Sequence, residues 1–120
     1  MLLGVVSDTH NNLKNIKTII NLFNEYGVNC VVHTGDITSA STLEKFSALN
    51  VELYVVLGNN DREEKGLNEI AEANGFHLSE PPFSISKYGR NIVIFHEPDF
   101  IKEFLTTNEN IDMVLHGHTH

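Results

Sequence analysis

The chain has 120 residues, 41% of them hydrophobic and 20% charged, which predicts one soluble globular domain spanning residues 1–120. Its net charge is −8, and its 8 basic residues are scattered along the chain, so non-specific nucleic-acid binding is not expected. No apolar segment approaches the roughly 20 residues of a membrane helix, and the opening "MLLGVV" is too short for a signal peptide. We therefore expect a cytoplasmic protein without a membrane partner.

The first half of the chain alternates between short apolar runs and helical patterns. Residues 2–6, 30–33 and 51–58 are predicted strands, each followed directly by polar residues. Between the first two, apolar residues at helical spacing predict a helix that ends at Gly27. This order of elements is typical of parallel strands joined by crossover helices. The lone Cys30 lies inside an apolar run and is expected to be a buried thiol.

Two further helices are predicted between residues 40 and 80. Ser41 and Glu44 have the spacing of a capping box and indicate a short helix. Asp61 resembles the cap of a second helix, which should end near Gly75.

After the double proline at 81–82, the pattern changes to that of a β-hairpin. Residues 83–97 read as two strands that turn at 88–90. Pro98 is expected to open another helix, and residues 112–117 form a last predicted strand.

Polar residues of metal-ligand type follow strand after strand. They are Asp8, His10, Asp36, Asn59, His96, His118 and His120. Parallel strands end at one edge of a sheet, so these side chains are expected to converge. Oxygen and imidazole donors without thiolates suit Mn²⁺, Fe²⁺ or Zn²⁺. Seven ligands exceed the need of one ion, whereas two ions about 3.5–4 Å apart would use them all and replace the missing basic patch.

Five motifs in this order, "DTH", "GDI", "GNND", "FH" and "GHTH", resemble those of the calcineurin-like metallophosphoesterases. More narrowly, they are similar to the small single-domain bacterial and archaeal phosphodiesterases of that superfamily. The resemblance runs from Met1 to His120. It implies an α/β fold in which helices flank a two-sheet β-sandwich.

The resemblance also implies the roles of the site residues. Asp8, His10 and His120 would bind one ion, Asn59, His96 and His118 would bind the other, and Asp36 would bridge the two. A metal-bridging hydroxide would then hydrolyse small phosphate esters, with Mn²⁺ the expected metal and Fe²⁺, Zn²⁺, Ni²⁺ and Co²⁺ as alternatives. Asp36, Asn59 and Asn60 are the predicted catalytic residues. The competing interpretation is a catalytically weak or inactive scaffold or metal-binding module with the same fold.

Three features depart from the wider superfamily. Asn60 stands where many members have a histidine that protonates the leaving group or contacts the phosphate. Because an amide does not titrate, we expect a preference for good leaving groups. Glu97 follows His96, where a glycine is common. Related enzymes usually continue beyond the last motif, so this chain is expected to be shortened at its C-terminus, with an incomplete second sheet whose edge invites a dimer or a partner chain.

Three other histidines are interpreted as structural. His33 and His116 lie close to the motifs and are read as packing or supporting residues, and His77 as a plain loop or strand residue.

Overall fold

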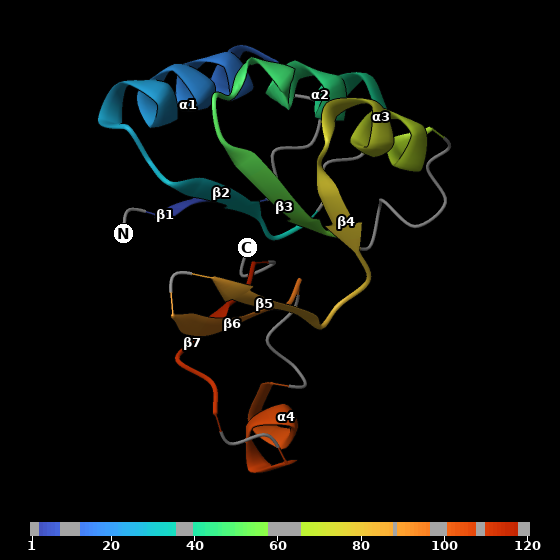
Figure 1. The fold of residues 1–120 in the computed structure, drawn as a ribbon. Helices are drawn as coiled ribbons and strands as arrows, with labels where there is room; N and C mark the ends of the chain where they lie inside the picture. The colour runs from blue at the N-terminus through green and yellow to red at the C-terminus, as the bar shows by residue number, and fades with distance from the viewer. Residues whose placement is uncertain are drawn as a thin grey trace.

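The computed structural model describes residues 3–7, 13–35, 40–57, 66–87, 89–96, 101–107 and 110–117. It contains two β-sheets that face each other, with helices on the outer side of each sheet (Figure 1). Among the helices described, none is long and apolar enough to span a membrane.

The first sheet, sheet A, contains four parallel strands in chain order. They are β1 (Leu3–Val6), β2 (Cys30–His33), β3 (Glu52–Val56) and β4 (His77–Ser79). Its outer face is covered by helices α1, α2 and α3 (Figure 1). Their bounds are Leu13–Tyr26, Ala40–Lys45 and Leu67–Asn74, and a short 3-10 helix, Phe46–Ala48, extends α2.

The second sheet, sheet B, contains three strands in the order β5, β6, β7. They span Phe83–Lys87, Arg90–Ile94 and Met113–Leu115. The β5–β6 pair is an antiparallel hairpin, whereas β6 and β7 are parallel and are connected through helix α4, Ile101–Thr107. This helix lies on the side of sheet B away from sheet A (Figure 1). There, the rings of Phe95 and Phe104 meet edge to face, 5.4 Å apart.

Sheet A is buried on both faces, which explains why its central strands are continuous apolar runs. One core cluster joins the outer face of sheet A to its helices and includes Ile16, Val31 and Phe46. The other lies between the two sheets and includes Val32, Val56 and Ile94. The predicted burial of Cys30 is confirmed, since its side chain is 3% exposed and belongs to this second cluster.

Most of the predicted elements are confirmed, and the exceptions concern helix starts and one strand. Ser41 lies inside α2 rather than at its N-cap, so the predicted capping box is wrong. The N-cap of α3 is Gly66, not Asp61, which lies outside the described residues. Strand β4 was not predicted as an element, whereas His77, interpreted as a loop or strand residue, lies on this edge strand.

Candidate metal centre

The backbones of β1 and β2 remain paired at the carboxyl ends of these strands. The amide of Thr34, just after β2, donates a hydrogen bond of 2.9 Å to the carbonyl of Val6, the last residue of β1. Gly35 follows with a φ of 115°, a conformation that side chains larger than hydrogen disfavour. Its amide donates to Nδ1 of His33 at 3.0 Å. Asp36 is the next residue in the chain.

His96 links this edge of sheet A to sheet B. Its side chain is 2% exposed, and its Nδ1 lies 2.7 Å from the carbonyl oxygen of Thr34, 62 residues away in the chain. Because a carbonyl oxygen only accepts, Nδ1 must carry the hydrogen. In a neutral imidazole the lone pair then resides on Nε2, which is also buried. A histidine that binds a metal usually has this arrangement, with its other ring nitrogen donating to a carbonyl or carboxylate.

The ladder between β6 and β7 also continues past the strands. Phe95 donates from its amide to the carbonyl of Leu115 at 2.8 Å, and Gly117 donates to the carbonyl of His96 at 3.0 Å. The backbone of His96 is therefore bonded to the residue that directly precedes His118 in the chain.

The end of β3 reaches the same edge of sheet A. Val55 pairs with His33, and the amide of Leu57 donates to the carbonyl of Ser79 at 2.9 Å. Leu57 precedes Asn59 by two residues. The structure thus brings the ends of β1, β2, β3 and β6 to one edge of the sandwich. Five of the seven predicted ligands follow these ends in the sequence, and the other two, His118 and His120, follow β7.

Of the predicted site residues, the structure describes His96 alone. Asp8, His10, Asp36, Asn59, Asn60, His118 and His120 lie outside the described residues. Within the part of the chain that is described, no three His, Cys, Asp or Glu side chains are grouped to bind a metal ion. The seven-ligand set therefore stays a prediction.

The burial and orientation of the His96 ring test whether this site fits a metal ion. Its ring is buried and oriented by a backbone carbonyl, with its basic nitrogen opposite that hydrogen bond. Thr34 adds a buried hydroxyl, Oγ1, without a hydrogen-bond partner among the described residues. These features fit a divalent cation, which requires a deprotonated, fixed imidazole.

The three histidines interpreted as structural occupy distinct surroundings. His33 is fully buried, and its ring meets that of Phe46 edge to face at 5.8 Å. The exposed His116 has its Nδ1 3.3 Å from the carbonyl oxygen of Gly117. His77 is exposed and stacks on Tyr54, with the ring centroids 4.5 Å apart.

Sequence reasoning missed Thr34, whose contribution is a main-chain carbonyl. Any residue type supplies that group, so no side-chain pattern marks it. Its position between a predicted strand end and a predicted ligand was the only available signal.

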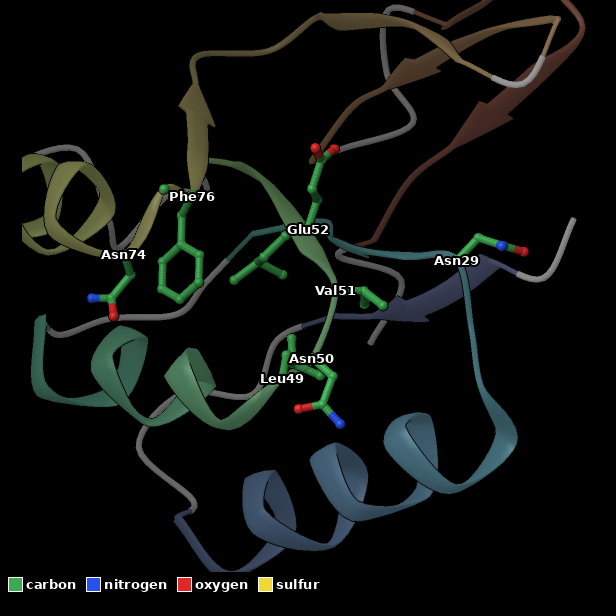
Figure 2. A pocket seen from close by; sticks show the side chains of 9 residues that line it. Asn29, Leu49, Asn50, Val51, Glu52, Asn74 and Phe76 are labelled. Carbon is green, nitrogen blue, oxygen red and sulfur yellow. The ribbon is translucent and has the colours of Figure 1, made fainter.

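An open cavity of about 470 Å³ lies elsewhere, where strands β2 to β4 begin. Figure 2 shows Asn50, Glu52 and Asn74 among the side chains around it. The predicted ligands follow the opposite ends of these strands, and none of them lines this cavity. It is therefore separate from the candidate metal centre.

Comparison with known proteins identifies the class to which this fold belongs. Residues 1–120 match the family model described as the calcineurin-like phosphoesterase superfamily domain. The phosphodiesterase MJ0936 of Methanocaldococcus jannaschii is 32% identical over 122 residues, covering the whole of this chain and 74% of that protein. The probable metallophosphoesterase MJ0623 of the same archaeon is 29% identical, and the match covers 59% of its length.

Solved structures agree. A structure described as that of a novel archaeal phosphodiesterase superimposes with a TM-score of 0.88 at 32% identity, over all of this chain and 74% of the other. The Escherichia coli phosphoesterase YfcE superimposes with a TM-score of 0.63 at 20% identity, over 82% of this chain and 58% of its own, which supports the fold alone.

The chain therefore belongs to the calcineurin-like phosphoesterase superfamily, a family of metal-dependent hydrolases. The predicted fold class and the predicted enzyme class are confirmed. The family implies divalent metal ions as cofactors.

Proposed function

We propose that this protein is a cytoplasmic phosphodiesterase that hydrolyses small phosphate esters with two divalent metal ions, Mn²⁺ foremost. The observation that supports this most directly is the hydrogen bond from Nδ1 of His96 to the carbonyl of Thr34. It holds the ring in the tautomer whose Nε2 lone pair can bind a metal, at the edge where four strands end. The curated relative and the solved structure that are named as phosphodiesterases support the reaction class.

The proposed ligands are Asp8, His10 and His120 for one ion, Asn59, His96 and His118 for the other, and Asp36 as the bridge. When bound, such ions neutralise phosphoryl charge and make water a better nucleophile near neutral pH.

The chemistry of His96 and Asn60 favours substrates with good leaving groups. The Nδ1 hydrogen of His96 is committed to Thr34, and Nε2 is the proposed ligand atom, so this ring has no proton to give. Asn60 does not titrate. An ester whose leaving group needs no protonation, such as a nitrophenyl diester, is therefore the preferred probe.

The test is hydrolysis of bis(p-nitrophenyl) phosphate by metal-stripped protein titrated with Mn²⁺. We expect a rate that rises with Mn²⁺ and falls roughly 100-fold or more in Asp36→Ala and His96→Ala, because loss of a ligand should cost at least what loss of a supporting residue does.

His77→Ala is the matched control, because it removes an exposed imidazole from the edge strand β4 and should leave the rate unchanged. A flat trace from folded, Mn²⁺-loaded protein would rule out catalysis and favour the scaffold interpretation. Full activity in His96→Ala would show that His96 is not a metal ligand.

A further inference from the structure

We propose that His33 is a positioning residue for the metal centre, acting through the backbone of Gly35. The inference rests on the proposed function, since it concerns how Asp36, the proposed bridging ligand, is presented. The geometry that points to it is the 3.0 Å hydrogen bond from the amide of Gly35 to Nδ1 of His33.

Each of the three residues before Asp36 is held by a separate contact. The backbone of His33 pairs with Val6 on one side and with Val55 on the other. Thr34 donates to the carbonyl of Val6 and accepts from His96. Gly35 comes next, where the ladder has ended, and its amide is bonded to the His33 side chain. The His33 bond is thus the last fixed contact before the proposed ligand.

The bond is needed because Gly35 is buried and leaves the extended conformation. With a φ of 115°, it turns the chain away from the strand direction. A buried amide beyond the end of a strand has no partner in the sheet and requires another acceptor. A side chain two residues earlier provides one in the manner of an Asx-turn, where an asparagine or aspartate oxygen accepts from the amide two residues on.

The same bond fixes the tautomer of His33. Because Nδ1 accepts, it carries no hydrogen, and in the neutral ring the hydrogen lies on Nε2. His33 and His96 are therefore opposite tautomers: the first accepts at Nδ1, and the second donates from it. Both rings are buried, and each orients the chain segment that leads into or contains a proposed ligand.

The ring of His33 also fills space in the outer core, edge to face with Phe46. If His33 had only a structural role, packing against Phe46 would be its whole contribution. Separating the two roles requires one variant that keeps the acceptor and loses the ring, and one that keeps apolar bulk and loses the acceptor.

His33→Asn and His33→Leu meet these needs. The asparagine Oδ1 is attached at the same position as Nδ1, so it can accept from the Gly35 amide, whereas leucine offers no acceptor. Phe46→Leu is the matched packing control, because it removes the ring contact and leaves the Gly35 bond in place.

The measurements are the Tm of metal-free protein and the Mn²⁺ dissociation constant by calorimetry. We expect His33→Leu to weaken Mn²⁺ binding by about 10- to 100-fold, the usual effect of losing a residue that supports a ligand. His33→Asn and Phe46→Leu should lower Tm and bind Mn²⁺ within about threefold of wild type.

Each other outcome is informative. His33→Leu that loses Tm but binds Mn²⁺ like the wild type would reduce His33 to a packing residue. Wild-type protein that binds no Mn²⁺ would defeat the proposed function itself, and the positioning role with it. If His33→Leu does not fold, nitrogen NMR of the wild type decides: an Nε2-protonated ring and an exchange-protected Gly35 amide are expected, and an Nδ1-protonated ring would overturn the proposal.

Discussion

At Gly4, strand β1 and helix α1 approach so closely that no side chain fits between them. A β-carbon added there would lie 2.9 Å from Cε1 and 3.0 Å from Cδ1 of Phe23. Real β-carbons essentially never come that close to a neighbouring atom, so the ring would have to move. Gly4 therefore sets how near α1 can pack against the edge of sheet A.

We expect Gly4→Ala to destabilise the protein by about 1–3 kcal/mol, the usual cost of overpacking a core. Urea unfolding followed by circular dichroism measures this cost. In a Phe23→Leu background the same substitution should cost less, because two of the ring atoms that it meets, Cε1 and Cζ, are gone. An equal cost in both backgrounds would show that Phe23 is not the obstacle.

At the scale of elements, α3 shows how one residue ends a helix. Gly75 adopts the left-handed backbone conformation, with φ 71° and ψ 24°, and its amide donates to the carbonyls of Ala71 and Glu72. Apart from its chain neighbours and the backbone of α3, no described atom lies within 4 Å of where its β-carbon would be. A substitution at Gly75 thus tests backbone conformation without a steric clash.

Gly75→Ala should lower the free energy of unfolding by about 1 kcal/mol, because alanine is strained in the left-handed region. Gly75→Asn is the matched comparison and should cost less, since asparagine tolerates this conformation. Thermal unfolding of both variants provides the measurement. Identical losses would indicate that something other than the backbone angle at this position matters.

The ends of helices were more predictable than their starts. Gly27 and Gly75 were identified as stops because a glycine follows each helical pattern, and both adopt a positive φ, which glycine tolerates best. Ser41 and Asp61 were misread as caps, because a polar residue before an apolar pattern is common on any solvent-exposed segment. Strand β4 was missed because it has three residues and its His77 is exposed, so it carries no apolar run.

At the scale of the whole molecule, the proposed metal ligands come from both sheets. Asp8, Asp36 and Asn59 follow strands of sheet A, whereas His96 follows a strand of sheet B. Ions bound between them would stabilise the packed sandwich as one unit. At about 100 times the dissociation constant, a single site contributes about 2.7 kcal/mol, or a rise in Tm on the order of 10 °C.

Differential scanning calorimetry with and without Mn²⁺ tests this expectation. The rise should disappear with a chelator and shrink in His96→Ala, whereas His77→Ala should retain it. An undiminished rise in His96→Ala would mean that Mn²⁺ binds elsewhere on the chain.

The sequence predicted the architecture well because strand ends, apolar runs and turn glycines are local signals. It also predicted that the strand ends before the candidate ligands lie together, because parallel strands deliver their ends to one edge. It did not predict the hydrogen bond that orients His96, since the acceptor is a backbone group 62 residues away. The full ligand set, the single domain and the dimer stay predictions.

The bond between His96 and Thr34 also bears on when a newly made chain becomes active. The first half of the chain, up to Ser79, contains sheet A and its helices, whose contacts are largely local βα units. That half carries Thr34 but has no imidazole from sheet B to bond to it. Synthesis from the N-terminus would therefore produce first a half that lacks the His96 ring. On the proposed ligand set, hydrolysis would begin only once sheet B had docked and His118 and His120 had been made, so a partly made chain would not attack phosphate esters prematurely.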